Sequence, residues 1–250
     1  MNPALEVPPD PGSDPGCVVE RPMPASTKTI VLLPGFMLDD ALWDDFVPHL
    51  PRDWNVLPIA LPQGRTVLEV AQAVAAGLAG PAVVVGFSMG GYVGRSLAVA
   101  YPQLVQALVL VATSGRRERP AARFSAAGDP GSFAGLSRRA IQGALSRQRA
   151  DDQVLVERVR AMGVRLGGEA FAWQSALDRT DVPLQEIACP TLVVAARQDR
   201  LRSIDEAREL AGAIPGAHLE IIEDAGHLIP LEAPALLAGM LVEWLRDRAH

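Results

Sequence analysis

The residues with the clearest potential for chemistry are a serine and two glycines in a short turn. Gly86, Ser88 and Gly90 form the pattern Gly-x-Ser-x-Gly directly after the apolar residues 82–85, and a helical pattern follows until Pro102. A continuous apolar run is typical of a strand that is buried on both faces. In a strand–turn–helix context the pattern predicts a nucleophile elbow, a strained turn that raises the serine hydroxyl above the strand end. The alternative is an ordinary glycine and serine turn.

A serine hydroxyl is a weak nucleophile at neutral pH, so this interpretation requires a histidine base. The sequence has four histidines. His49 falls in an expected helix, His218 in an expected strand and His250 at the end of the sequence. Only His227 combines a loop after the last expected strand with a preceding glycine. We therefore predict that His227 is the base, and a surface or core histidine is the alternative.

The base needs a third group, a carboxylate that fixes its tautomer and orientation. Asp199 directly follows the apolar run 191–196. Asp205 lies in a helix-start sequence that explains it, and Asp224 is too close in sequence to His227 to be favoured. Asp199 is therefore the predicted orienting acid.

A site for acyl transfer also needs two backbone N–H donors that bind the oxyanion. Met89 follows the predicted nucleophile and begins the helix, where N–H groups and the helix dipole favour negative charge. Phe36 lies in the turn after the first expected strand, and Gly35 permits a close approach there. We predict that Phe36 and Met89 are these donors. The alternative at Phe36 is a plain strand-end loop.

The elements that must position these residues alternate between strand and helix patterns. Apolar runs predict strands at residues 29–33, 54–59, 82–85, 107–112, 191–196 and 218–222. Helical patterns follow at 38–50, 67–79, 89–101, 204–211 and 234–245, and capping-box sequences begin at Thr66 and Ser203. This alternation predicts an α/β fold with a mostly parallel sheet and helices on both faces. Sites in such sheets lie beyond the carboxyl ends of the strands, which would bring the candidate loops to one edge.

The segment 115–182 differs from the rest of the chain. It lacks strand signals, is rich in arginine and shows helical periodicity at 135–149, 152–166 and 169–178. We interpret it as a helical lid inserted into a core of residues 28–114 and 183–250. The favoured interpretation of its positive charge is a solvent-exposed helix surface. The alternative is that the charge attracts acidic substrates, with Arg116 and Arg117 as candidate contacts. Residues 1–27, rich in Pro, Gly and Asp, predict a flexible leader.

The composition limits the class of protein. With 250 residues, of which 49% are hydrophobic, the chain suits one α/β domain with an insertion. The net charge of −6 argues against general affinity for nucleic acid, and no apolar run reaches the roughly 20 residues of a membrane span. Cys17 and Cys189 form no disulfide framework, and Cys189 is expected to be a buried thiol. No signal-peptide pattern is visible, so the cytoplasm is the expected location.

Several motifs are shared with a known superfamily: LLPGF (32–36), VVVGFSMGGYV (83–93), AYP (100–102), LVLVATS (108–114), PTLVVAARQDRL (190–201) and EDAGHLIPLEAP (223–234). With these motifs the chain resembles the α/β-hydrolase superfamily, especially its small lidded esterases, enol-lactonases and C–C hydrolases. The order Ser88, Asp199, His227 is also the order of that superfamily. One departure is Pro34, where relatives often have histidine before the glycine.

The expected function is that of a serine hydrolase, which cleaves a carboxylic ester, lactone or thioester through an acyl-enzyme on Ser88 without a metal or organic cofactor. The same residues could serve C–C bond hydrolysis, acyl transfer or perhydrolysis, and the fold also hosts ligand-binding members without activity. The expected partner is a small acyl substrate, whereas the natural substrate and the oligomeric state stay open. Substrate contacts are predicted at residues for which ordinary packing is the alternative: Phe87, Met37, Phe124, Trp173 and Leu228.

Overall fold

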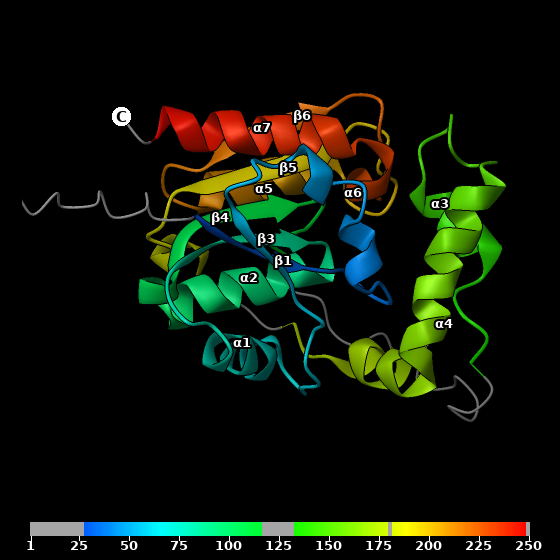
Figure 1. Ribbon diagram of the computed structural model, residues 1–250, viewed down its shortest axis with the longest axis horizontal. Coiled ribbons are helices and arrows are strands. Elements are labelled where there is room, and N and C mark those ends of the chain that lie inside the picture. Colours follow the sequence, from blue (N-terminus) through cyan, green and yellow to red (C-terminus); the bar gives the residue numbers. More distant parts are fainter. Residues whose placement is uncertain (1–27, 117–132, 180–181, 249–250) are drawn as a thin grey trace, which may run out of the picture.

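The computed structural model describes residues 28–116, 133–179 and 182–248. Its described strands form one six-stranded sheet in the order β2-β1-β3-β4-β5-β6, in which every neighbouring pair is parallel (Figure 1). The strands are β1 (Thr29–Leu33), β2 (Asn55–Pro58), β3 (Ala82–Phe87), β4 (Val105–Val111), β5 (Thr191–Ala196) and β6 (His218–Ile222). The predicted α/β fold is confirmed. The predicted leader at 1–27, with Cys17, lies outside the described residues.

Apolar side chains pack on both faces of the sheet, so its inner strands are buried on both sides. Every residue of β3 and β5 is buried. Along β1, Ile30 and Leu32 belong to one core cluster and Val31 and Leu33 to the other, which is the alternation that a pleated strand imposes. The edge strand β6 instead alternates exposed and partly buried residues. The candidate nucleophile therefore follows one of the best-shielded strands.

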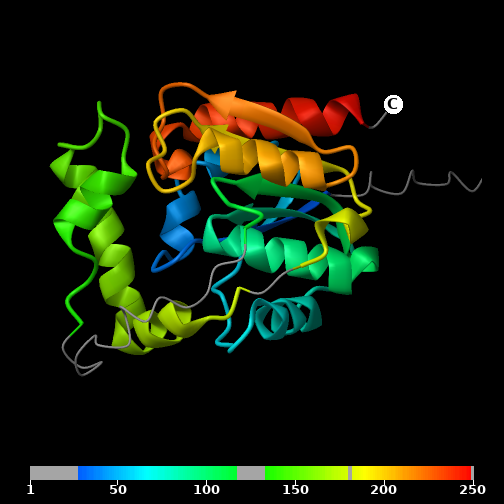
Figure 2. The same cartoon turned by 180° about the vertical axis from the view of Figure 1, so that it is seen from behind.

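Helices cover both faces of this sheet, as the opposite views in Figures 1 and 2 show. Three of them, α1 (Val67–Ala76), α2 (Met89–Ala100) and α5 (Ile204–Ala213), bury their apolar sides in one core cluster. The C-terminal helix α7 (Pro234–Asp247) packs into the other cluster. Three further short elements lie among the strands and helices of the core: η3 (Pro102–Leu104), η6 (Leu184–Glu186) and α6 (Ile229–Glu232).

Residues 38–50 do not form the helix that their apolar spacing predicts. They form two short 3₁₀ helices, η1 (Asp40–Trp43) and η2 (Val47–His49). Pro48 accounts for part of this difference, because proline in a helix interior removes a hydrogen bond and clashes with the preceding turn. Leu42 and Phe46 are nevertheless fully buried. The pattern therefore identified the buried residues and not the type of helix.

The two predicted capping boxes form to different extents. At α5 the Ser203 hydroxyl accepts from the N–H of Glu206, and the Glu206 carboxylate accepts from the N–H of Ser203. At α1 the Thr66 hydroxyl accepts from the N–H of Glu69. The Glu69 carboxylate, however, accepts from the backbone and the guanidinium of Arg65. The box at α1 is therefore only half formed.

The described part of the segment 115–182 is mainly helical. Helices α3 (Arg138–Ala144) and α4 (Gln153–Ala176) stand between β4 and β5 in the sequence. Helix α4 unites two predicted helices across a kink at Gly167, whose φ of 78° is not helical. Figures 1 and 2 show α3 and α4 beyond the end of the sheet to which the strand arrows point. The insertion thus lies at the edge where the strand-end loops meet.

Candidate active site

Ser88 occupies a strained turn between β3 and α2. Its φ of 48° and ψ of −109° lie in a region that side-chain-bearing residues rarely adopt, at a cost of about 1–3 kcal/mol. Hydrogen bonds offset this strain: the Ser88 N–H donates to Val111 O at 2.8 Å, and the Thr113 hydroxyl donates to Ser88 O at 2.8 Å. The turn therefore has the backbone geometry of the predicted elbow.

The glycines on either side of Ser88 are required by space. A Cβ on Gly86 would lie 2.5 Å from Gly90 O, and a Cβ on Gly90 would overlap Leu33 O and lie 2.6 Å from Pro34 O. Helix α2 can approach β3 and the end of β1 this closely only because both positions lack side chains. The Gly-x-Ser-x-Gly spacing is thus a packing requirement as well as a motif.

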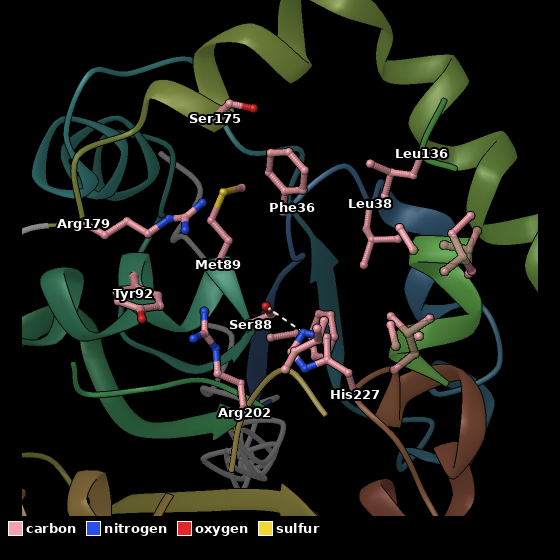
Figure 3. Close-up of a pocket in the computed structure, with 18 residues that line it drawn as sticks. Phe36, Leu38, Ser88, Met89, Tyr92, Leu136, Ser175, Arg179, Arg202 and His227 are labelled. Atoms are coloured by element: carbon pink, nitrogen blue, oxygen red, sulfur yellow. Dashed lines mark hydrogen bonds between the residues drawn. The ribbon is translucent and has the colours of Figure 1, made fainter. Parts of the chain in front are cut away.

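The three residues predicted from the strand ends form a hydrogen-bonded series. His227 Nε2 lies 3.0 Å from Ser88 Oγ, shown as the dashed line in Figure 3, and His227 Nδ1 lies 2.8 Å from Asp199 Oδ2. The side chains of His227 and Asp199 are only 7% and 1% exposed. An ionised carboxylate can only accept, so Nδ1 carries the proton and Nε2 can accept from the serine hydroxyl.

The second carboxylate oxygen of Asp199 is also bonded. Asp199 Oδ1 accepts from the backbone N–H groups of Leu201 at 2.7 Å and Arg202 at 2.9 Å. Both oxygens therefore have donors, which holds the carboxylate in one orientation toward the histidine.

The loop that carries His227 is tied to the insertion by backbone contacts. The His227 N–H donates to Ala144 O at 2.7 Å. Glu232 accepts from the N–H of Gly226 at 3.0 Å with one oxygen and from the N–H of Ser146 at 2.7 Å with the other. A Cβ on Gly226 would lie 2.5 Å from the carbonyl carbon of Leu145. Glu232 was not predicted as a site residue, although it lies within the 223–234 motif.

A cavity of about 900 Å³ opens above Ser88, between the strand-end loops and the insertion. Residues from the strand-end loops and α2 line one part: Phe36, Leu38, Phe87, Ser88, Met89, Tyr92, Leu201, Arg202, His227 and Leu228. Residues from 136–179 line the other: Leu136, Ala140, Ile141, Gly143, Ala144, Val159, Ser175 and Arg179. Most of these side chains are apolar, so the cavity suits a substrate with a hydrocarbon part.

The two residues predicted to bind the oxyanion both line this cavity. Met89 is the first residue of α2, so its N–H has no acceptor within the helix. Phe36 lies in the turn after β1, and its ring contacts Phe171 of α4 at a centroid distance of 5.7 Å. Figure 3 shows the Met89 side chain near Ser88 and the Phe36 ring farther from it, toward the helix that carries Ser175.

The predicted substrate contacts divide into two groups. Phe87 and Leu228 line the cavity, whereas Met37 and Trp173 do not. Met37 has a φ of 54°, is fully buried, and donates its N–H to Gln174 Oε1 at 2.7 Å. Trp173 packs against the core cluster that also holds α1 and α2. The fifth predicted contact, Phe124, lies outside the described residues.

Sequence reasoning missed several polar lining residues, among them Tyr92, Arg179 and Arg202. Tyr92 could have been found, because it lies one helical turn after Ser88 on the same face of α2. Arg116, for which exposed charge was the favoured interpretation and an anion contact the alternative, pairs with Glu209 of α5 at the surface. This pairing raises the pKa of Arg116 and lowers the pKa of Glu209. Arg117 lies outside the described residues.

Metal-ligating residues do not gather in the described ranges, where no group of three His, Cys, Asp or Glu side chains could hold an ion. Among the helices of those ranges, none has the length and apolar character that a membrane crossing needs. Cys189 is a free, partly buried thiol, and burial raises its pKa.

Comparisons with known proteins agree with this fold. A pimeloyl-[acyl-carrier protein] methyl ester esterase from Aromatoleum aromaticum is 29% identical, over 87% of this chain and 98% of that protein. A hydrolase from Pseudomonas aeruginosa PA01 superimposes with a TM-score of 0.78 at 27% identity, covering 88% of this chain and 91% of that chain. The enol-lactonase from Burkholderia xenovorans LB400 also gives a TM-score of 0.78, at 23% identity over 89% and 92% of the two chains.

A family model decides the assignment. The model of the Alpha/beta hydrolase family matches residues 30–240, which include the described strands β2 to β6 and β1 from Ile30 onward. The match confirms the resemblance drawn from the sequence motifs, and the chain therefore belongs to the alpha/beta hydrolase family.

Proposed function

We propose that this protein is a serine hydrolase that cleaves carboxylic esters through an acyl-enzyme on Ser88. The observation that carries the proposal is the series of contacts from Asp199 through His227 to Ser88, which ends at the floor of a largely apolar cavity. Lactones and thioesters present the same acyl carbon to the nucleophile, so they belong to the same proposed chemistry.

The reaction begins with a proton transfer. His227 Nε2 accepts the Ser88 proton while Oγ attacks the acyl carbon, and Asp199 stabilises the imidazolium. The backbone N–H groups of Phe36 and Met89 bind the oxyanion of the tetrahedral intermediate. His227 then protonates the leaving alkoxide, and the acyl-enzyme forms. In the second half, His227 removes a proton from water, which attacks the acyl carbon. The imidazolium then returns this proton to Ser88 Oγ as the acyl–Oγ bond breaks and the acid leaves.

The insertion supplies the wall for the acyl part of the substrate. Side chains of α3 and α4 such as Ile141 and Val159 are buried and face the cavity, opposite the strand-end loops. We propose that residues 115–182 act as the lid of this site. The names of relatives support an ester substrate, since the Aromatoleum aromaticum protein is named for a methyl ester.

The test is hydrolysis of p-nitrophenyl esters of increasing acyl length by the wild type and by Ser88→Ala. We expect the variant to lose at least about 10³-fold in kcat, because it lacks the nucleophile. Ser96→Ala is the matched control, since Ser96 lies two turns further along α2 and does not line the cavity. It should keep the wild-type rate within about twofold.

Equal rates in the wild type and in Ser88→Ala would refute ester hydrolysis through Ser88. A fluorophosphonate then separates the remaining alternatives. Labelling of Ser88 in the wild type would point to another use of the same residues, such as C–C hydrolysis, acyl transfer or perhydrolysis. Absence of labelling would point to a ligand-binding protein.

A further inference from the structure

The charges that line the cavity are distributed unevenly. Of the described lining residues, Arg179 and Arg202 carry permanent charge, and none is acidic. Both arginines lie on the Tyr92 side of Ser88 in Figure 3, whereas Leu38 and Leu136 lie on the opposite side. The cavity therefore combines an apolar wall with a wall that bears two positive charges.

Arg202 is fixed close to the proposed catalytic residues. Its backbone N–H donates to Asp199 Oδ1, and its guanidinium Nη1 lies 3.8 Å from Glu206 Oε1. The side chain is only 20% exposed. Glu206 is itself held by the Ser114 hydroxyl and by the capping box of α5. Arg202 thus reaches the cavity from a loop that cannot move without disturbing Asp199.

Arg179 reaches the cavity from the end of the insertion. The preceding residue, Asp178, is bonded to the chain next to α1: its N–H donates to Arg65 O at 2.9 Å, and its carbonyl accepts from Val67 at 3.0 Å. The Arg179 guanidinium lies 5.9 Å from the centre of the Tyr92 ring. The end of the insertion and the loop after β5 therefore bring guanidinium groups to the same wall.

We propose that the substrate is an ester whose acyl part carries a second, ionised carboxylate, bound by Arg179 and Arg202. This inference rests on the proposed esterase function and adds the substrate class. A guanidinium matches a carboxylate with parallel N–H donors, and a partly enclosed cavity strengthens the attraction relative to water. The methylene groups between the ester and the carboxylate would lie in the largely apolar cavity.

The experiment compares half-esters with neutral esters of the same shape. The substrates are monomethyl glutarate, adipate and pimelate, each paired with the monomethyl ester monoamide of the same diacid. For at least one chain length, we expect kcat/KM of the wild type to be about tenfold or more higher for the acid than for the amide. Arg179→Met and Arg202→Met should each reduce this ratio about tenfold, and Arg202→Lys should retain part of it.

Arg116→Met is the control for general electrostatic attraction. Arg116 is exposed, pairs with Glu209 and does not line the cavity, so this variant should keep the wild-type ratio. A wild type that hydrolyses the amides as well as the acids would overturn the carboxylate site and leave the esterase function intact. The carboxylate site would also be overturned if Arg116→Met reduced the acid-to-amide ratio of kcat/KM as much as Arg179→Met and Arg202→Met do.

Labelling of Ser88 separates the failure of this inference from the failure of the proposed function. If neither series is hydrolysed but a fluorophosphonate labels Ser88, the labelling rate is measured with glutarate and with its neutral diamide. Protection by glutarate that is lost in Arg202→Met would support the carboxylate site, and equal protection by both compounds would overturn it. If Ser88 is not labelled at all, the proposed function fails, and with it the inference.

Discussion

The floor and the cover of the cavity are held in place by different interactions. We define the floor as the strand-end loops at residues 34–36, 86–91, 197–202 and 224–228, and the cover as helices α3 and α4. In the floor, a Cβ on Gly86 would lie 2.5 Å from a backbone oxygen, whereas a Cβ on Gly143, which lines the cavity from α3, would meet nothing within 4 Å. The floor is therefore close-packed backbone, and the cover has room for additional atoms.

The ties between the cover and the core are also of a different kind. Helix α4 buries an apolar face that includes Val156 and Met162. Besides the buried hydrogen bond from Met37 N–H to Gln174 Oε1, its polar ties to residues 39–45 include the ion pairs of Arg165 with Asp39 and of Arg158 with Asp45. Exposed ion pairs each contribute about 0–1 kcal/mol. We infer that the proposed chemistry depends on the close-packed floor. Substrate choice, in contrast, depends partly on side chains of the cover, which can be replaced at little cost to the stability of the fold.

The largest expected effect comes from changing the floor chemically without changing its packing. Asp199→Asn should lower kcat/KM for a p-nitrophenyl ester by about 10³–10⁴-fold, because an amide no longer fixes the histidine tautomer. Asp205→Asn is the matched control, since the Asp205 side chain is 78% exposed and pairs only with Arg208 among the described ion pairs. Similar rates for the two variants would exclude Asp199 from the proposed role.

A second test measures the packing difference directly. Gly86→Ala should lower the free energy of unfolding by roughly 3 kcal/mol or more, because the added methyl group would overlap the backbone of α2. Gly143→Ala should instead leave the protein as stable or up to about 1 kcal/mol more stable, since alanine favours helix. Urea unfolding of both variants checks this pair. Equal destabilisation would remove the distinction between floor and cover.

Glu232 joins the two regions, and its replacement should have an intermediate effect. Glu232→Ala removes the acceptor for two backbone N–H groups, one in the His227 loop and one after α3. We expect a total loss of about 1.5–3 kcal/mol in stability and a lower kcat through displacement of His227. Glu232→Gln keeps one acceptor oxygen, so its stability and its kcat should lie between those of Glu232→Ala and those of the wild type.

Limited proteolysis completes this test, because a loosened cover should be cleaved faster near Ser146 in Glu232→Ala. The exposed Glu243 of α7 provides the control. If Glu232→Ala and Glu243→Ala have the same kcat and the same rate of cleavage, Glu232 does not couple the regions.

The smallest effect is expected for an ion pair of the cover. Arg165 Nε lies 2.7 Å from Asp39 Oδ2, and this contact raises the pKa of Arg165. The arginine side chain is 54% exposed, so Arg165→Met should change the free energy of unfolding by less than about 1 kcal/mol. The difference should shrink further in 1 M salt, which screens exposed charges. A loss of several kcal/mol in the free energy of unfolding that does not change with salt would contradict this prediction, because it would show that the Arg165–Asp39 pair stabilises the cover strongly.

Local sequence signals predicted the parts of this protein that depend on nearby residues. Apolar runs located the six strands of the described residues, and a parallel topology gathers their carboxyl ends, so the sequence already predicted that Ser88, Asp199 and His227 lie together. Strand burial and turn geometry are properties of a few consecutive residues, which is why they can be read from the sequence.

Phe87 and Leu228 line the cavity as predicted, but only the tertiary structure decided which of the other side chains do so. Met37 turns into the core and binds Gln174, 137 residues away, and Trp173 packs beside α1 and α2, although both were predicted contacts. Arg179 lines the same cavity as Arg202 because the end of the insertion returns beside Tyr92. Such choices depend on contacts between distant segments, whose relative positions no local pattern encodes.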